Sequence, residues 1–289
     1  MEARERALLS INTLDIVSAI GCRDLRFMRR WLELAVRRPA LAFARQVLAF
    51  DDAAAAAGIQ AAARDLLSVY TNSFDVRGET RLPTAGPLLI VSNHPGMIDT
   101  AALFASIPRM DLRILAADRP FLRSLSAVSR SLIFISDDTR WRMSAMRAAV
   151  DHLRAGGVLL TFPAGEIEPD PAVLPGAREA LDRWSASTAT FLRFVPRAVV
   201  APVVVSGVLS PRAQRHPLTR LRRSSRDREW LGAMLQIVVR TILTESWPVR
   251  ARVDFLEPFA AGVLDEAPED ATRRVRDRVA DYLMSRERA

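Results

Sequence analysis

The chain has 289 residues, of which 49% are hydrophobic, with 41 basic and 33 acidic residues that give a formal net charge of +8. This hydrophobic content is ample for a packed core, either in one large domain or in one domain with an appendage. The single cysteine, Cys22, excludes an internal disulfide framework and a cysteine-based metal site.

The sequence also indicates a location and a class of partner. No apolar run reaches the roughly 20 residues of a membrane span, and the N-terminus shows no secretory cleavage site, so we expect a cytoplasmic protein. All the basic residues are arginine, and a basic surface favours anionic partners such as phospholipid headgroups. The chain has no nucleic-acid-binding motif and few aromatic residues for base stacking, so we expect no nucleic-acid partner.

Residues 1–72 are predicted to form a helical N-terminal segment. Apolar and mainly basic residues alternate at helical spacing over residues 24–37, which predicts an amphipathic helix. Pro39 is expected to start a second helix. The aspartates at 51–52 are expected to cap an alanine-rich third helix that ends near Tyr70.

The first two predicted helices, over residues 24–50, permit two interpretations. One is docking on an anionic membrane, with Phe27 and Trp31 at the interface. The other is that the apolar face packs against the rest of the protein. The arginine-rich residues 212–228 are read as an exposed loop that either faces lipid or is simply solvated.

The remaining residues, 73–289, are predicted to form one α/β domain. Short apolar runs alternate with helical patterns, which favours a mainly parallel or mixed sheet flanked by helices, with its ligand site at the carboxyl ends of the strands. The strands are expected at residues 74–78, 88–91, 112–116, 132–135, 158–162, 199–205 and 250–256, and the main helices at 98–107, 119–128, 140–154, 230–243 and 269–286.

A histidine and an aspartate follow the apolar run 88–91. His94 comes directly before a Pro-Gly turn, and Asp99 follows after four intervening residues, in the first turn of the next predicted helix. A neutral imidazole whose other ring nitrogen is held by a carboxylate is suited to take a proton from a hydroxyl. Read alone, the pair is more simply explained as a capping aspartate beside an unrelated loop histidine.

A second strand, at residues 158–162, ends in a similar turn. Phe162 and Pro163 are followed by Ala164, Gly165 and Glu166. Gly165 is expected to let a substrate approach the backbone, with its N–H facing an oxyanion, while an ordinary turn with a solvated glutamate is the alternative.

Four ordered blocks together resemble the lysophospholipid acyltransferase family over residues 74–209. They are the segment from Asn93 to Asp99, the run 132–135, the turn from Phe162 to Glu166, and the strand around Pro202. The first block is specific when a Phe-Pro-x-Gly strand end follows it some 70 residues later, as it does here.

The resemblance implies a reaction and a set of roles. Members of this family transfer an acyl chain from acyl-CoA or acyl-carrier protein to a hydroxyl of a lysolipid. His94 is then the base and Asp99 its orienting partner, without a metal or a cofactor beyond the acyl donor. It also implies peripheral binding to the inner face of a membrane. The implied substrate-binding residues in the matching blocks are Asn93, Gly96, Phe162, Pro163, Gly165 and Glu166.

The chain departs from the family pattern where the acceptor's phosphate would bind. Asp137 and the segment Ala164 to Ile167 replace arginine-bearing motifs of glycerophosphate-acylating members. Arg140 or Arg142 could substitute as substrate-binding residues, although solvated helix positions are the simpler reading. With Asp137, Glu166 and Glu168 adding negative charge, lysophosphatidic acid is expected to be a poor acceptor.

Two alternatives to a lysophospholipid acyltransferase remain. One is an O-acyltransferase for an aminolipid or glycolipid acceptor. The other is a catalytically silent lipid-binding protein that keeps the fold. The intact pair of His94 and Asp99 favours an enzyme, because a silent relative has no physical need for the base.

Overall fold

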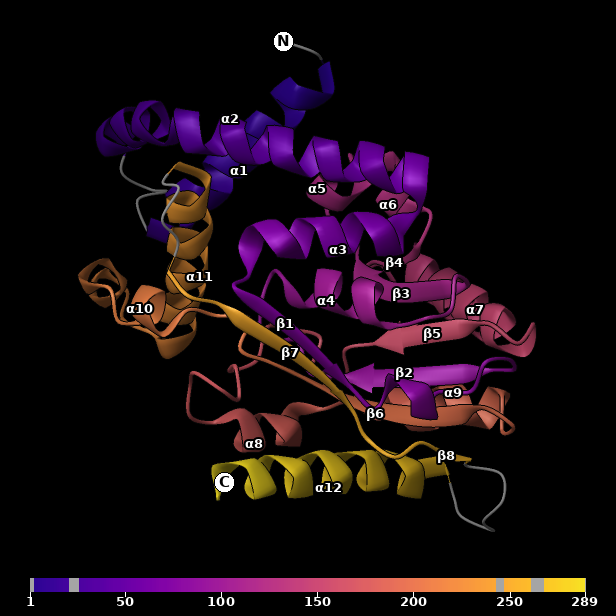
Figure 1. Ribbon diagram of the computed structural model, residues 1–289. Helices are drawn as coiled ribbons and strands as arrows, with labels where there is room; N and C mark the ends of the chain where they lie inside the picture. Colours follow the sequence, from indigo (N-terminus) through magenta and orange to yellow (C-terminus); the bar gives the residue numbers. More distant parts are fainter. Residues whose placement is uncertain (1–2, 21–25, 243–246, 261–267, 289) are drawn as a thin grey trace.

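The computed structural model describes residues 3–20, 26–242, 247–260 and 268–288 (Figure 1). Within them, one eight-stranded mixed sheet has the order β1-β7-β6-β2-β5-β3-β4, and β8 pairs with β6. The strands are β1 (Ser73–Arg77), β2 (Leu88–Ser92), β3 (Leu112–Ala117), β4 (Leu132–Ile135), β5 (Val158–Thr161), β6 (Val199–Ser206), β7 (Arg250–Phe255) and β8 (Phe259–Ala260). The prediction of a mainly parallel or mixed sheet flanked by helices is confirmed.

Helices precede, connect and follow these strands. The longer ones are α1 (Ala3–Ile20), α2 (Arg26–Ala57), α3 (Ile59–Tyr70), α4 (Asp99–Ser106), α7 (Thr139–Arg154), α9 (Ser187–Phe194), α11 (Ser225–Ile242) and α12 (Pro268–Glu287). The short ones are η1 (Glu79–Arg81), α5 (Pro120–Arg123), α6 (Ser126–Ser129), α8 (Ala177–Ala180), η2 (Leu181–Arg183), α10 (Pro211–Gln214) and η3 (Pro217–Leu221).

Strand β2 is the middle strand in the order β1-β7-β6-β2-β5-β3-β4. It pairs with β5 on one side and β6 on the other, both parallel, so its carboxyl end lies beside theirs. Strands β1 and β7 run in the opposite direction, because β7 is antiparallel to β6. In Figure 1, β2 and β5 point to the left, toward the side where α10 and α11 lie.

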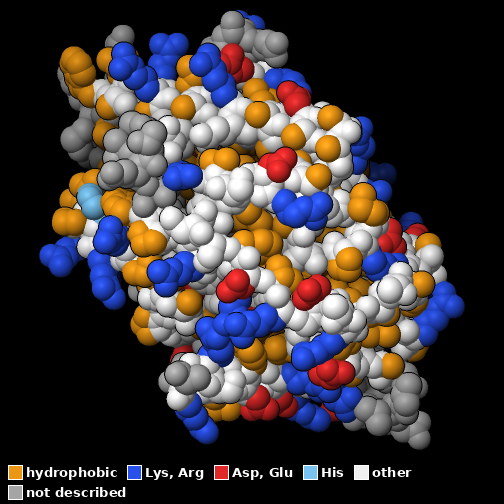
Figure 2. Space-filling model, viewed as in Figure 1, with side chains coloured by type: hydrophobic (Ala, Val, Ile, Leu, Met, Phe, Trp, Pro, Cys, Tyr) orange, Lys and Arg blue, Asp and Glu red, His pale blue; other side chains and the backbone are white. Residues whose placement is uncertain are grey.

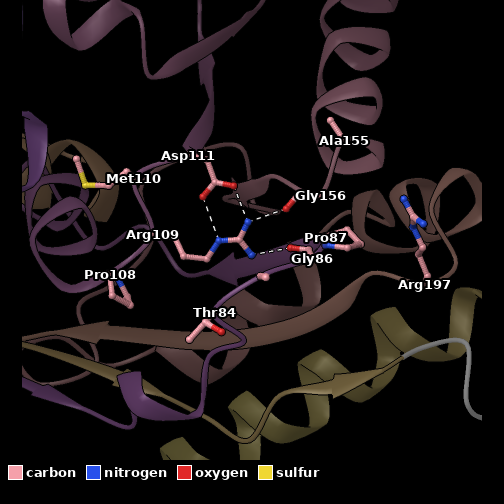
Figure 3. Close-up of a pocket in the computed structure, with 11 residues that line it drawn as sticks. Thr84, Gly86, Pro87, Pro108, Arg109, Met110, Asp111, Ala155, Gly156 and Arg197 are labelled. Carbon is pink, nitrogen blue, oxygen red and sulfur yellow. Dashed lines mark hydrogen bonds and ion pairs between the residues drawn. The ribbon is translucent and has the colours of Figure 1, made fainter.

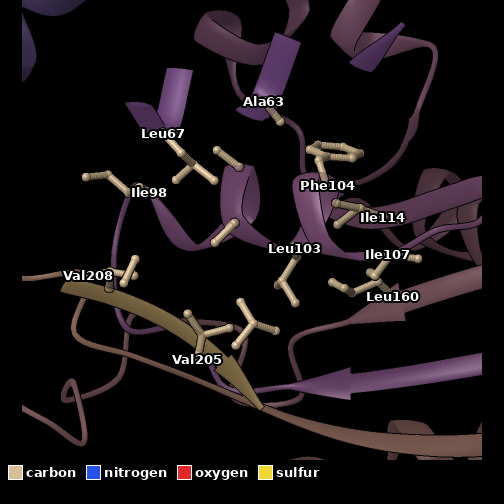
Figure 4. Close-up of a cluster of buried hydrophobic side chains, with 14 of the residues drawn as sticks. Ala63, Leu67, Ile98, Leu103, Phe104, Ile107, Ile114, Leu160, Val205 and Val208 are labelled. Carbon is tan, nitrogen blue, oxygen red and sulfur yellow. The ribbon is translucent and has the colours of Figure 1, made fainter. Parts of the chain in front are cut away.

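Both faces of the sheet are covered, and this explains the continuous apolar run of β2. Leu88 and Ile90 pack toward α3 and α4, whereas Leu89 and Val91 pack toward α7, α9 and α12. Figure 4 shows the first of these layers, with Leu103 of α4 lying between the helices and the sheet. A strand buried on both faces has no polar side to show in its sequence.

The predicted N-terminal helices have different boundaries from the observed ones. Helix α2 continues through Pro39 and ends only at Ala57, and the next helix starts after Gly58, whose φ is +87°. A proline inside a helix removes one hydrogen bond, but α2 packs against α1, α3 and α11 along its length, and this packing outweighs the loss. Side chains of α2 and α3 share the core of the sheet, and the division of the chain at residue 72 stays a prediction.

Asp51 caps a helix, but not the predicted one. It lies inside α2 with 1% of its surface exposed, and its carboxylate accepts hydrogen bonds from the backbone N–H groups of Ala127 (2.8 Å) and Val128 (3.0 Å) in α6. Arg4 of α1 pairs with the same carboxylate. The sequence predicted that Asp51 caps a helix. It could not predict which helix, because the capped residue Ala127 lies 76 residues further along the chain.

We expect Asp51→Ala to lower the free energy of unfolding by about 2–4 kcal/mol, because two buried N–H donors and a guanidinium lose their acceptor. The matched control is Asp52→Ala, since Asp52 is 72% exposed and lies 3.6 Å from Arg4. Chemical denaturation of both variants measures the difference. Equal stability losses in the two variants would contradict the assignment.

Other elements also depart from the predictions. Helix α1 lies in the segment predicted to be helical, but no helix was delimited there, because Asn12 and Asp15 interrupt its apolar pattern; Asn12 is buried and donates to the carbonyl of Ala40. Residues 212–228 are not a loop, because α10, η3 and the start of α11 occupy most of them. Strand β8 follows the strand expected to be last. The start of the docking helix at residue 24 and the side chain of Phe27 lie outside the described residues.

Among the helices that the structure describes, none combines the length and the apolar character needed to cross a membrane.

Candidate active site

His94 and Asp99 are joined by a hydrogen bond at the carboxyl end of β2. The distance from His94 Nδ1 to Asp99 Oδ2 is 2.6 Å. Asp99 is fully buried at the start of α4, and its Oδ2 also accepts the backbone N–H of Gly96 at 3.0 Å. Its Oδ1 accepts the N–H and the hydroxyl of Thr100. The carboxylate is therefore fixed from several sides, and His94 Nε2 is left as the nitrogen that can accept a proton.

The surroundings of His94 change its basicity. Burial lowers the pKa of the imidazole, but the charge and hydrogen bond of Asp99, together with the charge of Glu168, raise it, and the net pKa lies above the ordinary 6.5. The side chain is 27% exposed, so the ring is reachable from solvent. A base with this pKa holds a proton more firmly than a free histidine does.

Phe162 lies against the imidazole. The two ring centroids are 4.5 Å apart and the planes are inclined by 27°. The contact follows from the sheet, because β2 and β5 are parallel and in register up to Val91 and Thr161, so the next residues of both strands emerge side by side. Phe162 thus restricts the orientation of the ring.

Glu168 holds the backbone of His94 from the other side. Its carboxylate Oε2 accepts the His94 N–H at 2.9 Å, and its own N–H donates to the His94 carbonyl at 2.8 Å. Its Oε1 accepts the indole N–H of Trp184 at 2.6 Å. Burial raises the pKa of Glu168 to about 7, although these hydrogen bonds and the charges of His94 and Arg183 act in the opposite direction.

Asp170 connects the loops that follow β5 and β6. It is fully buried and accepts the backbone N–H groups of Gly207 (2.8 Å) and Leu209 (3.0 Å). Burial raises its pKa, against the effect of these hydrogen bonds. Leu209 in turn packs on the turn after His94, because a Cβ added at Gly96 would lie 3.2 Å from Leu209 Cδ2. Gly96 is therefore placed for close packing.

Two predicted substrate-binding residues have other contacts in the structure. The amide side chain of Asn93 is buried and bonds to both the carbonyl (2.9 Å) and the N–H (2.8 Å) of Val205. It joins the ends of β2 and β6 rather than facing a substrate. Pro163 is buried, and its carbonyl accepts the N–H of Ser185 at 3.0 Å.

The expected oxyanion role of the Gly165 N–H is wrong for this structure. That N–H donates to the carbonyl of Phe162 at 3.0 Å and closes a tight turn in which Gly165 has φ +66°. The expectation of open space is met, since a Cβ added at Gly165 would find no atom within 4 Å.

Glu166 is bound by two arginines. Its carboxylate lies 3.0 Å from Arg183 of η2 and 2.9 Å from Arg226 of α11. The expectation that Glu166 and Glu168 repel an acceptor phosphate assumed two free negative charges, and the structure shows neither as free. Glu166 is neutralised by guanidinium groups, and Glu168 is buried behind His94, where its N–H partners and raised pKa reduce its effect on an incoming anion.

Arg140 and Arg142 lie in the first turn of α7, after β4. Both side chains are exposed, and Arg142 donates to the carbonyl of Asp137 at 3.1 Å. Asp138 caps this helix by accepting the N–H groups of Arg140 and Trp141. Among the described residues, neither arginine is hydrogen-bonded to the group around His94, which favours their reading as solvated helix positions.

A cavity lies at the opposite ends of the strands, beside their amino ends. It has a volume of about 740 Å³ and is lined by residues that precede β2, β3 and β5 (Figure 3). Arg109 lies at its centre, paired with Asp111 and donating to the carbonyls of Gly86 and Gly156, both at 2.6 Å. This cavity is separate from the site at His94, because its lining residues lie before the strands and His94 lies after β2. The described residues contain no cluster of histidine, cysteine and acidic side chains suited to a metal ion.

Comparison with known proteins identifies the domain that carries this site. Residues 73–206 match the family model described as Acyltransferase. They therefore form an acyltransferase domain, which confirms the family resemblance indicated by the sequence blocks. The match contains His94, Asp99, Phe162 and Glu168.

One solved structure is similar over most of its length. It is the 1-acyl-sn-glycerophosphate (LPA) acyltransferase PlsC from Thermotoga maritima, with 15% identity, coverage of 98% of both chains and a TM-score of 0.47. A likeness of this strength assigns neither a donor nor an acceptor to this chain. None of the curated proteins compared with the chain matches it significantly.

Proposed function

We propose that the protein transfers a fatty acyl chain from an acyl thioester, acyl-CoA or acyl-carrier protein, to a hydroxyl of a lysophospholipid. The observation that carries the proposal is the 2.6 Å hydrogen bond between His94 and Asp99 at a strand end of an acyltransferase domain. That arrangement supplies a base whose tautomer is fixed. The ring proton is on Nδ1, which donates a hydrogen bond to the carboxylate, and the unprotonated Nε2 can accept a proton.

The reaction follows in two steps. As the acceptor oxygen bonds to the thioester carbonyl carbon, its proton passes to His94 Nε2 and the carbonyl electrons move onto oxygen. The resulting tetrahedral intermediate collapses, the C–S bond breaks, and the thiolate takes the proton from the imidazolium. Asp99 stabilises the imidazolium between these steps, and no covalent acyl-enzyme forms.

The proposal is tested by incubating the purified protein with acyl-CoA and separate panels of lysophospholipids, lyso-aminolipids and monoacylglycerol, then identifying products by mass. We expect an acylated lysophospholipid. A product from lyso-aminolipids alone would replace the acceptor in the proposal, and the absence of any product with acyl-CoA and with acyl-carrier protein would favour a silent lipid-binding protein.

We further propose that the protein works while bound peripherally to an anionic membrane, on its inner face. Trp31 and Leu34 of α2 are 71% and 63% exposed, and Leu218 and Leu221 of η3 are 46% and 64% exposed. Helix α2 begins on the side toward which β2 and β5 point, the side of His94 (Figure 1). Figure 2 has the same view and shows this side along its left edge, where arginine and hydrophobic side chains lie together near α10.

Trp31→Glu should weaken binding to anionic vesicles at every salt concentration. It removes apolar area that the proposal buries in the membrane, and salt does not screen that contribution. The control is Phe194→Glu at the opposite edge of the sheet, where the side chain is 53% exposed. Vesicle flotation measures both. Equal recovery of wild-type protein on neutral and anionic vesicles, or equal losses in the two variants, would contradict this orientation.

A further inference from the structure

The ion pairs of Glu166 form an unusual group at the edge of the active site. Arg183 comes from η2 and Arg226 from the first turn of α11, 43 residues later, yet both contact one carboxylate in the turn after β5. Glu166 is two residues from Glu168, whose carboxylate and N–H both bond to the backbone of His94. The two guanidiniums are thereby tied to the same loop that holds the backbone of the proposed base.

The group is open to solvent. The exposed fractions of the side chains are 51% for Arg183, 70% for Arg226 and 28% for Glu166. Glu229 lies close enough to Arg183 and Arg228 for their charges to lower its pKa, which burial raises. Arg183 also acts on Glu168, so three guanidiniums lie near three carboxylates, of which Glu168 has a pKa raised to about 7 and carries only part of its charge near neutral pH.

The space beside the group is also available. No atom lies within 4 Å of a Cβ placed on Gly165, the residue before Glu166, so a headgroup can approach the backbone there. A carboxylate held by two arginines uses the same acceptor geometry as two phosphate oxygens. Two phosphate oxygens therefore match the two arginines as the Glu166 carboxylate does.

We infer that Arg183 and Arg226 bind the phosphate of the acceptor lysolipid, with Glu166 holding the two arginines in position until the phosphate replaces it. The inference rests on the proposed function, since it assigns a headgroup to that reaction. The acceptor is favoured over the phosphates of CoA by distance: a glycerol backbone separates its phosphate from the reacting hydroxyl by only a few bonds, whereas the long pantetheine arm separates the phosphates of CoA from the thioester.

Kinetics with matched acceptors test the inference. Arg183→Ala combined with Arg226→Ala should raise the KM for lysophosphatidic acid by about tenfold to a hundredfold per arginine, the effect of losing one charge-assisted hydrogen bond. The KM values for monoacylglycerol of the same chain length and for acyl-CoA should change less than about twofold. Arg183→Lys should restore part of the loss, and Glu166→Gln should lower the KM for lysophosphatidic acid.

The matched control is Arg193→Ala, which breaks an exposed arginine–glutamate pair between α9 and α12, away from the site. It should leave all three KM values unchanged. Equal losses for lysophosphatidic acid and monoacylglycerol would overturn the inference and make the group a structural link, and a rise in the KM for acyl-CoA alone would assign the arginines to the donor.

A binding measurement separates this inference from the proposed function. Titration of glycerol 3-phosphate into the full chain should show binding that Arg183→Ala with Arg226→Ala weakens by a similar factor, whether or not the protein turns over. If no acyl transfer is found but this binding is seen, the proposed function fails and the anion site stands. If the wild-type chain transfers acyl groups but does not bind glycerol 3-phosphate, the anion site fails alone.

Discussion

His94→Ala should lower the rate of acyl transfer by roughly 10²–10⁴-fold while leaving the fold intact, because it removes a positioned general base. The imidazole is partly exposed and its main contacts are within the site, so its loss leaves no large cavity in the core. Steady-state turnover with saturating acyl-CoA and lysophospholipid measures the effect, and thermal unfolding checks the fold.

Met97→Ala is the matched control, because Met97 lies in the same turn, is 40% exposed and carries no acid–base group. It should keep most of the wild-type rate. Near wild-type turnover in purified His94→Ala would refute the central assignment, since the reaction would then not depend on this base.

Asp99→Asn should lower the rate by up to roughly 10⁴-fold through the wrong tautomer of His94. Asp99 uses one oxygen for His94 and Gly96 and the other for Thr100. An asparagine amide must turn its NH₂ either toward the N–H of Thr100, which is unfavourable, or toward Nδ1, which moves the imidazole proton to Nε2. The double variant with His94→Ala should be no slower than the single histidine variant.

The pH profile distinguishes this role from a purely structural one. The neutral base is the active form, so kcat/KM should rise with pH through the pKa of His94, which lies above 6.5 in the wild type. Asp99 raises that pKa, so the midpoint in Asp99→Asn should move to lower pH while the plateau falls. A lower plateau with an unmoved midpoint would argue against direct coupling of the two groups.

The sequence predicted those parts of the site that are close together along the chain. His94 and Asp99 are five residues apart, and a strand, a Pro-Gly turn and a helix start are enough to bring them together. The α/β class and most strands were predicted for the same reason, because each depends on a local pattern. The bounds of helix α1 and the continuity of α2 were missed because tertiary packing overrides weak local signals there.

The supporting residues could not be found in this way. Glu168 contacts a backbone 74 residues away, and Asn93 contacts one 112 residues away. No spacing in the sequence encodes such pairs, so Glu168 was interpreted as a negative charge that would disfavour a phosphate, and Asn93 as a substrate contact. Arg183 and Arg226 were missed likewise, because each is one of 41 basic residues and only the fold brings them to Glu166.

The central place of β2 in the sheet has a consequence for synthesis of the chain. Asn93, at the end of β2, is hydrogen-bonded to Val205 of β6, and the turn at Gly96 packs on Leu209. Residues 205–209 must therefore leave the ribosome before His94 is fixed. Pairings this distant in sequence form slowly during folding. A nascent chain therefore acquires its base only after more than two thirds of its 289 residues have been made, and shorter translation products carry the His-Asp motif without a working site.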